Sequence, residues 1–412
     1  MADKTILIVG TYDTKSDELA YMRACVEGQN GRALTMDVSV LGDPPQPADY
    51  SKHDVAAAAG SSIEAVIASG DENSAMTIMA AGASALARRL FDEGRFDGLI
   101  ALGGTMGTDL ALDVCGTLPM GVPKYIVSTV AFSPLIPADR LAGDIQMILW
   151  AGGLYGLNSI CKSSLSQAAG AALGAARAVE PPRRDRPLVG MTSLGKSCLR
   201  YMVDLKPALE ERGFEVAVFH ATGMGGRAFE SFAAEGAFAA VMDFAMQELG
   251  NHVNGSIVSS GPDRVENAGA RGIPQLIAPG SIDLIDLPTW QPLPEAYTDR
   301  PYHAHNRLIA SVAATPDERR ATARAMGDKL AAAKGPVHVI LPMHGIEEWD
   351  REGEDAHDPE GLAAFLDEMQ SAIRPPVEMT RIDAHINDPA FVDTALAVFD
   401  RWVAHGLIRT TV

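Results

Sequence analysis

The sequence predicts an α/β protein with two domains, each built on a mainly parallel sheet that is flanked by helices. Short apolar runs alternate with segments of helical periodicity along nearly the whole chain, which is typical of βαβ units. Several of these runs end in glycine-rich loops, as strands of such sheets do where they meet a ligand. A chain of 412 residues with 47% hydrophobic residues is long enough for more than one core.

The first half of the chain predicts four strands and a set of helices. The strands are expected at 5–9, 33–40, 97–102 and 123–130, and the helices at 16–26, 64–67, 73–91, 109–115 and 154–179. The polar, proline-rich segment 180–187 predicts the boundary, so we expect domains over 1–180 and 187–412. Both domains open with a strand, a polar loop containing lysine, and an amphipathic helix, which indicates that they are related.

The second half repeats this alternation. Strands are expected at 187–189, 214–219, 238–244, 255–260, 274–278, 337–341 and 377–382, and helices after residue 197 and at 265–271, 316–333, 359–373 and 389–405. Residues 286–307 are expected to form a long polar and aromatic loop. The final helix could pack back on the first domain.

Composition restricts the class of partner and the compartment. A net charge of −19 without a basic stripe argues against nucleic acid and against an anionic membrane. The four cysteines are scattered, which fits a reducing compartment better than a disulfide framework. No signal peptide precedes the strand at 5–9, and no apolar run reaches membrane-spanning length. We therefore expect a soluble, cytoplasmic protein.

A phosphate-binding pattern opens the second domain. Residues 190–197 fit G-x-x-x-x-G-K-[ST], with Lys196 to offset phosphate charge and Ser197 to reach a metal ion. Asp243 could supply the carboxylate for magnesium, or it could equally cap the next segment. An ordinary strand-to-helix turn is the alternative for the loop itself.

A second glycine-rich loop follows the next strand, at residues 220–227. Its glycines let the backbone approach an anion closely, and Arg227 offers a guanidinium group that matches phosphate oxygens. Because two such loops follow consecutive strands, we expect them to share one site.

The first domain has a comparable pair of loops. The substrate pocket is predicted to be lined by Thr11, Asp13, Lys15, Gly103, Gly104 and Thr105, which follow two of its strands. The second of these loops lacks the G-x-G-x-x-G register, so a dinucleotide fingerprint is not supported.

Other chemistry is less well supported. His303 and His305 could ligate a metal, but without a third assigned ligand a hydrogen-bonding role is favoured, and no metal site is predicted. Asp383 and His385 are better explained by turn formation and helix capping. Ser259 and Ser260 lie outside any G-x-S-x-G elbow, so a hydrolase triad is not expected.

Several stretches together resemble the Tm-one-like ATP-binding domain family, which includes a tomato mosaic virus resistance protein. They are residues 9–19, 102–108, 156–158, 219–230, 259–264, 272–283, 303–306 and 385–391. The resemblance runs essentially end to end. It implies two Rossmann-like domains, a homodimer or higher homo-oligomer, and ATP as the bound cofactor, with Mg²⁺ left open.

The resemblance also implies which residues contact the nucleotide. They come from three loops of the second domain: Thr192; then Thr222, Gly223, Met224, Gly225, Gly226 and Arg227; then Ser260, Gly261, Pro262 and Asp263. At 195–197 this sequence departs from the family, which more often has threonines there, so the phosphate-loop match could be incidental.

Three classes of function follow. The first is an ATP-dependent enzyme that acts on a small organic acid or sugar derivative held by the first domain. The second is a non-catalytic binding protein that ATP regulates. The third is a lyase or isomerase of a phosphorylated metabolite.

Overall fold

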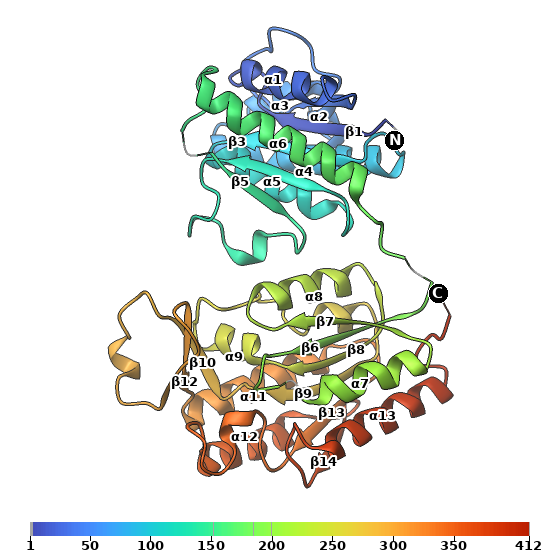
Figure 1. The fold of residues 1–412 in the computed structure, drawn as a ribbon, viewed down its shortest axis with the longest axis vertical. Coiled ribbons are helices and arrows are strands. Elements are labelled where there is room, and N and C mark those ends of the chain that lie inside the picture. Colours follow the sequence, from blue (N-terminus) through green and yellow to red (C-terminus); the bar gives the residue numbers. More distant parts are fainter. Residues whose placement is uncertain (1–2, 151, 184, 199, 412) are drawn as a thin grey trace. The chain divides into compact units, whose positions relative to one another are not determined.

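The computed structural model describes residues 3–150, 152–183, 185–198 and 200–411. The chain divides into two compact units, residues 1–182 and 183–412, and the change of unit falls within the proline-rich segment 180–187. Each unit contains a parallel sheet with helices on both faces, so the predicted α/β class is confirmed (Figure 1).

The first unit is a five-stranded parallel sheet in the order β2-β1-β3-β4-β5. Its strands are β1 (Thr5–Gly10), β2 (Arg32–Asp37), β3 (Gly98–Gly103), β4 (Lys124–Ser128) and β5 (Gln146–Leu149). Its helices are α1 (Ser16–Glu27), α2 (Lys52–Ala58), α3 (Ile63–Ile67), α4 (Glu72–Asp92), α5 (Thr105–Thr117) and α6 (Ser159–Ala178), with a 3-10 turn η1 (Ala138–Arg140). The strand order reverses at β1, whose two neighbours are β2 and β3.

Alternate residues of β1 point into two separate cores. Ile6 and Ile8 are buried with α1 and α6, whereas Leu7 and Val9 are buried with α2, α4 and α5. A strand that is buried on both faces is expected to be a continuous apolar run, and residues 5–9 are one. Asp71 caps the N-terminus of α4 through a bond from the Ser74 N–H (2.9 Å).

The second unit is a six-stranded parallel sheet in the order β14-β13-β9-β8-β6-β7. Its strands are β6 (Leu188–Ser193), β7 (Glu215–His220), β8 (Phe238–Ala245), β9 (Gln275–Gly280), β13 (Val337–Pro342) and β14 (Glu378–Ile382). A separate antiparallel sheet, in the order β10-β12-β11, contains β10 (Leu284–Pro288), β11 (Tyr302–Ala304) and β12 (Ile309–Ala313). The helices are α7 (Arg200–Glu211), α8 (Met224–Ala234), α9 (Gln247–Val253), α10 (Asn267–Ala270), α11 (Pro316–Ala331), α12 (Pro359–Ala372) and α13 (Pro389–Ala404), with 3-10 turns η2 (Glu295–Tyr297) and η3 (Glu348–Asp350).

Two segments of the second unit have a structure that contradicts the one predicted for them from the sequence. Residues 255–260 form no strand, because β8 pairs directly with β9 and Ile257 is 63% exposed rather than buried in a sheet. Residues 286–307, predicted as a loop, contribute most of β10 and all of β11 to the antiparallel sheet.

The final helix packs within the second unit. Phe399 of α13 meets the Phe214 ring edge-on at 5.0 Å, and Phe391 lies 5.6 Å from the Tyr201 ring of α7. Such ring pairs add about 0.5–1.5 kcal/mol to the burial of their area. The helix that the sequence could have placed on the first domain therefore covers one face of the second sheet with α7.

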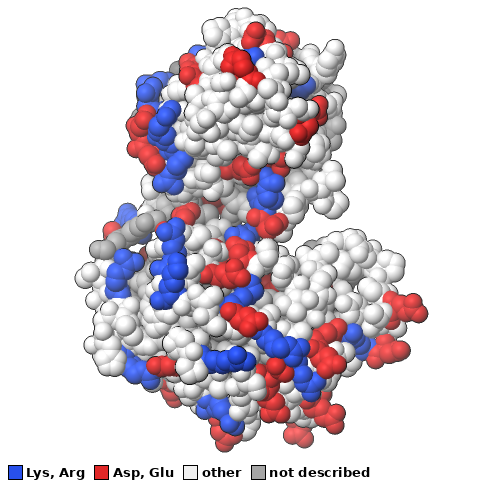
Figure 2. All heavy atoms as spheres, turned by 180° about the vertical axis from the view of Figure 1, so that it is seen from behind, with Lys and Arg blue, Asp and Glu red and all other residues white. Residues whose placement is uncertain are grey.

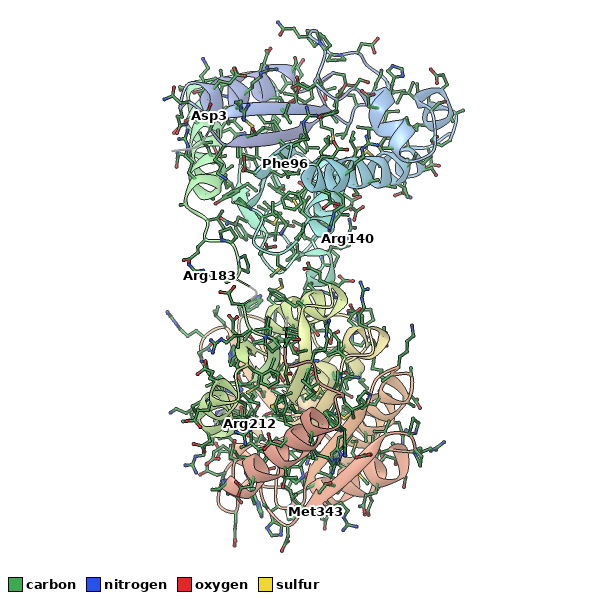
Figure 3. All side chains as sticks on the ribbon, turned by 90° about the vertical axis from the view of Figure 1, so that its right-hand side faces the viewer. Asp3, Phe96, Arg140, Arg183, Arg212 and Met343 are labelled. Atoms are coloured by element: carbon green, nitrogen blue, oxygen red, sulfur yellow. The ribbon has the colours of Figure 1, made fainter. Side chains whose placement is uncertain are left out.

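Charge is distributed over both units. On the face shown in Figure 2, lysine and arginine side chains are interspersed with aspartate and glutamate. Arg140 and Arg212 lie on the outside of their units, whereas Phe96 is buried in a core of the first unit (Figure 3). Among the described residues no helix is long and apolar enough to cross a membrane.

Candidate functional site

A cavity of about 790 Å³ opens at the carboxyl ends of β1, β2 and β3. This is the edge where the strand order reverses, the usual position of ligands in open α/β sheets. All six residues predicted for a substrate pocket line the cavity: Thr11, Asp13, Lys15, Gly103, Gly104 and Thr105. The volume lies within the range of small-molecule and cofactor sites, about 300–1,000 Å³.

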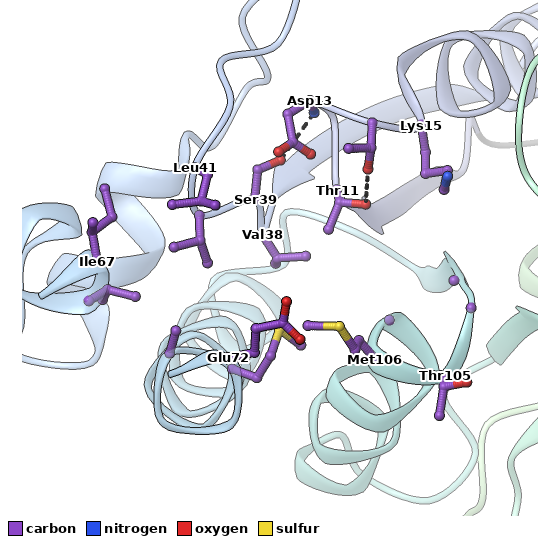
Figure 4. Close-up of a pocket in the computed structure, with 18 of the residues that line it drawn as sticks. Thr11, Asp13, Lys15, Val38, Ser39, Leu41, Ile67, Glu72, Thr105 and Met106 are labelled. Carbon is purple, nitrogen blue, oxygen red and sulfur yellow. Dashed lines mark hydrogen bonds between the residues drawn. The ribbon is translucent and has the colours of Figure 1, made fainter. Parts of the chain in front are cut away.

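Asp37, at the end of β2, holds two loops of the cavity in place. Its Oδ1 accepts hydrogen bonds from the backbone N–H of Tyr12 (3.2 Å) and of Ser39 (2.9 Å). The Ser39 hydroxyl in turn accepts a bond from the Asp13 N–H (3.1 Å). The loop after β1 is therefore fixed to the loop after β2, and the Asp13 side chain lies between them (Figure 4).

The N-terminus of α5 forms another wall. Gly103 must be glycine, because a Cβ there would lie 2.5 Å from the Cα of Gly107. Gly104, the N-cap, provides no side-chain oxygen, and the first turn contains no acidic residue. The first backbone N–H groups of a helix have no intrahelical acceptor and carry a partial positive charge. This end of the cavity is therefore suited to an anion.

Another part of the cavity wall is apolar. Its wall contains three exposed apolar side chains, Leu41 (79% exposed), Ile67 (47%) and Met106 (47%). They come from the loop after β2, from α3 and from α5, and they face the same space (Figure 4). Exposed apolar groups that converge on a cavity are a sign of a ligand surface. The sequence prediction missed this wall, because apolar residues in these segments are equally expected of a core.

Charge in the cavity is mixed. Asp13, Asp71 and Glu72 contribute carboxylates, whereas Lys15 is the ammonium group and donates to the Leu154 carbonyl. Oδ1 of Asp13 is buried and has no hydrogen-bond partner among the described residues. Within the same part of the chain, no three His, Cys, Asp or Glu side chains converge in a manner that would by itself hold a metal ion.

The phosphate-loop pattern of the second unit does not form a phosphate loop. Gly190 lies in the middle of β6, where a Cβ would meet the Phe238 ring at 2.8 Å. Thr192 is buried, and its hydroxyl donates to Asp243 (2.7 Å). The Ser197 hydroxyl donates to the Leu194 carbonyl (2.7 Å). The spacing of the pattern is present, but its first glycine belongs to the strand.

A protein carboxylate occupies the second glycine-rich loop. Glu248 Oε1 accepts the backbone N–H groups of Gly223 (2.5 Å) and Gly226 (2.9 Å), the groups expected to face phosphate. Gly225 must be glycine for packing, since its Cβ would lie 1.7 Å from the His220 carbonyl oxygen. The helix start is therefore neutralised within the protein.

Arg264 holds that carboxylate in position. It is fully buried and contacts Glu248 (3.0 Å), Glu230 (3.3 Å) and Asp243. Burial of Glu248, only partly offset by Arg264, raises the pKa of Glu248 to about 7. We call these four side chains the Arg264 cluster.

The other residues that were expected to contact the nucleotide are mostly buried or bonded within the protein. Arg227 forms a two-bond ion pair with Asp263 (2.7 and 3.0 Å), and Ser260 is completely buried. The Pro262 carbonyl accepts a bond from Lys329 (2.5 Å), whereas Met224 is 41% exposed. Gly261 has φ of 107°, a conformation that favours glycine, so its role in the turn requires no ligand.

Three predicted residues do share a second cavity of about 470 Å³: Lys196, Ser197 and Thr222. The structure adds residues that the nucleotide prediction did not include, among them Gln247, Asp286, His303, His305 and Trp349. The H-x-H spacing at 303–305 was the only sequence signal for this group. The pairing of β11 with β12, which brings those histidines to the cavity, could not be inferred from it.

Comparison with known proteins gives matches along nearly the whole chain. Residues 4–181 match the N-terminal domain of Uncharacterised protein family (UPF0261), and residues 186–403 match its C-terminal domain. A UPF0261 protein of Brucella melitensis is 59% identical over 98% of this chain and 96% of its own. One from Clostridium tetani is 33% identical over 94% of this chain and 96% of its own.

A plant relative is also similar. The ToMV resistance protein Tm-1(GCR237) of Solanum lycopersicum is 28% identical over 75% of this chain and 42% of its own length. The resemblance noted from the sequence motifs is thereby confirmed.

Proposed function

The chain belongs to Uncharacterised protein family (UPF0261), and from this starting point we propose that its first unit binds a nucleotide, ATP in the first instance. The observation that supports this is one cavity that joins the uncapped N-terminus of α5 to an apolar wall. A phosphate group would accept hydrogen bonds from the α5 N–H groups, and a base would lie against Leu41, Ile67 and Met106.

The acidic residues of the cavity fit a nucleotide that arrives with Mg²⁺. Mg²⁺ is commonly held by one or two carboxylates together with phosphate oxygens, and it reduces the repulsion between these negatively charged groups. Asp13 would supply the protein carboxylate, because its Oδ1 is buried without a partner among the described residues. Lys15 would face the phosphate chain, since it lines the same cavity.

This proposal places the nucleotide in the first unit rather than in the second. The loops first expected to bind ATP use their N–H groups and Arg227 for bonds within the protein. A nucleotide there would have to displace Glu248 from a fully buried cluster. In the first unit the α5 N–H groups require no such exchange.

Gly104→Asp tests the proposal by calorimetric titration of the whole chain with ATP and Mg²⁺. An N-cap aspartate accepts hydrogen bonds from the first N–H groups of a helix, so the fold should be kept or stabilised by about a few tenths of a kcal/mol relative to glycine. The same carboxylate occupies the position of the phosphate and repels it by its charge. We therefore expect the affinity for ATP to fall about 30–100-fold, a loss of about 2–3 kcal/mol.

Two controls locate the site. Gly104→Ala adds only a methyl group, whose nearest neighbour would be Thr129 Oγ1 at 3.8 Å, so ATP affinity should change little. Lys196→Met alters the second unit and should also leave ATP affinity unchanged. The proposal is wrong if the wild type does not bind ATP or if folded Gly104→Asp binds it equally well. Loss of affinity in Lys196→Met alone would place the nucleotide in the second unit.

A further inference from the structure

The second cavity contains a hydrogen-bonded chain of three side chains from three strands or their ends. His305 Nε2 lies 2.7 Å from the Ser311 hydroxyl, and that hydroxyl lies 2.5 Å from Asp286 Oδ1. Asp286 is 2% exposed and also accepts bonds from Gln247 (2.6 Å) and Asn251 (2.9 Å). Three side-chain donors fix this buried carboxylate in position. Asp286 is linked to His305 through the Ser311 hydroxyl.

The donors and acceptors of these three side chains determine which nitrogen of the His305 ring carries the proton. Burial raises the pKa of Asp286 to about 6, so at neutral pH it is ionised and can only accept. The single hydroxyl proton of Ser311 must then be donated to Asp286. The remaining bond must be donated by His305, which places its proton on Nε2. Burial and the neighbouring His303 lower the pKa of His305 to about 4, so the ring is neutral. Nδ1 then carries a lone pair, and it makes no hydrogen bond within the described part of the chain.

Aromatic packing restrains both histidines. Trp349 stacks on His303 with ring centroids 4.2 Å apart and lies 4.7 Å from the His305 ring. His303 Nδ1 is 3.5 Å from a carboxylate oxygen of Asp355. The rings therefore form a wall of the cavity rather than a mobile loop.

The cationic group of the cavity is Lys196. It is exposed at the turn after β6 and forms no ion pair within the described part of the chain. His220 and Thr222 lie in the same lining and add polar groups that suit oxygen ligands. The turn itself is held firmly, since the Ser197 carbonyl accepts bonds from the Asn387 side chain (2.7 Å) and the Glu348 N–H (3.1 Å).

From this arrangement we propose that the second unit binds a small organic oxyanion on Lys196 and that Nδ1 of His305 takes a proton from it. The X–H bond of the ligand breaks, its electron pair stays on the ligand, and the proton forms the second N–H of an imidazolium. Ser311 and Asp286 are positioning residues that stabilise that imidazolium, and Lys196 faces the added negative charge. A bound anion would itself raise the proton affinity of His305, because an opposite charge favours the protonated ring. The shared chemistry includes carboxylates and phosphate esters.

NMR of the full chain labelled with ¹⁵N-histidine tests the anion site and the protonation of His305. We expect His305 in the Nε2–H form, and a rise of its pKa by at least one unit on addition of inorganic phosphate or pyruvate. The two probes distinguish a phosphate from a carboxylate site. Lys196→Met should weaken the response at least tenfold, and Ser311→Ala should give mixed tautomers. His252→Gln is a matched control, because His252 contacts Ser259 (3.3 Å) outside this cavity.

Proton transfer is measured by exchange of the pyruvate methyl protons in D₂O. The wild type should accelerate this exchange at least tenfold over His305→Gln, whereas Gly104→Asp, which affects the first unit, should match the wild type. An Nδ1–H tautomer, or no response of His305 to either anion, would overturn the site. Equal exchange in the wild type and His305→Gln would overturn the proton transfer. Neither result depends on whether ATP binds the first unit.

Discussion

Replacement of Arg264 by methionine tests why the second glycine-rich loop is closed to phosphate. Arg264 is fully buried and is the cation of a cluster that contains Asp243, Glu230 and Glu248. Methionine preserves much of the apolar stem but removes the charge and every hydrogen bond. The carboxylates then remain buried without their counter-ion, and Glu248 loses the contact that fixes it at the start of α8.

The expected loss of stability in Arg264→Met follows from the burial of the ion pairs. Removing one partner of a buried ion pair costs about 3–5 kcal/mol, because an uncompensated charge remains in a low-dielectric site. For a unit of this size each kcal/mol shifts the melting temperature by about 2–4 °C, so Arg264→Met should melt about 6–20 °C lower. Arg212→Met is the matched control. Arg212 makes a similar two-bond pair with Asp400 but its side chain is 33% exposed, so the cost should be at most about 1 kcal/mol.

The pH dependence of the stability lost in Arg264→Met gives a second test. Burial already raises the pKa of Glu248 to about 7, and loss of Arg264 would raise it further, since Arg264 favours the ionised form. A carboxyl whose folded pKa exceeds its unfolded value loses stabilising effect as pH rises between the two. The deficit of Arg264→Met should therefore be larger at pH 8 than at pH 5. Calorimetric melts that show equal losses in both arginine variants, or a deficit that grows on acidification, would refute the reasoning.

Three further predictions concern Asp286 in the second unit and one glycine in each unit. Because burial raises the folded pKa of Asp286 to about 6 from an ordinary 3.8, its contribution is complete below pH 4 and is lost between pH 4 and 6. The free energy of unfolding should fall by up to about 3 kcal/mol over that range, and Asp286→Asn should flatten the slope in urea titrations at each pH. Gly226→Ala should destabilise the second unit by about 1–3 kcal/mol, since its Cβ would lie 1.8 Å from Glu248 Oε2. Gly174→Ala, in open space within α6, should stabilise the first by about 0.5–1 kcal/mol, and a loss of stability there would contradict the helix assignment.

The sequence by itself determined the α/β class, the alternation of most elements and the two polar loops that line part of the first cavity. These features depend on local information: apolar periodicity marks strands and helices, and glycine marks the turns between them. Since the carboxyl ends of parallel strands meet at one edge, the loops at 11–15 and 103–105 had to lie close together. Their convergence could therefore be predicted without knowing any side-chain contact.

Only the tertiary structure decided which of these loops has free hydrogen-bonding groups. The pattern at 190–197 has the spacing of a phosphate loop, yet the Phe238 ring packs on Gly190 and keeps it in a strand. The glycines at 223–226 lie at a helix start, yet Glu248, more than twenty residues away in sequence, already accepts their N–H groups. A motif specifies spacing along the chain, whereas the partner of each buried N–H is set by packing between distant segments.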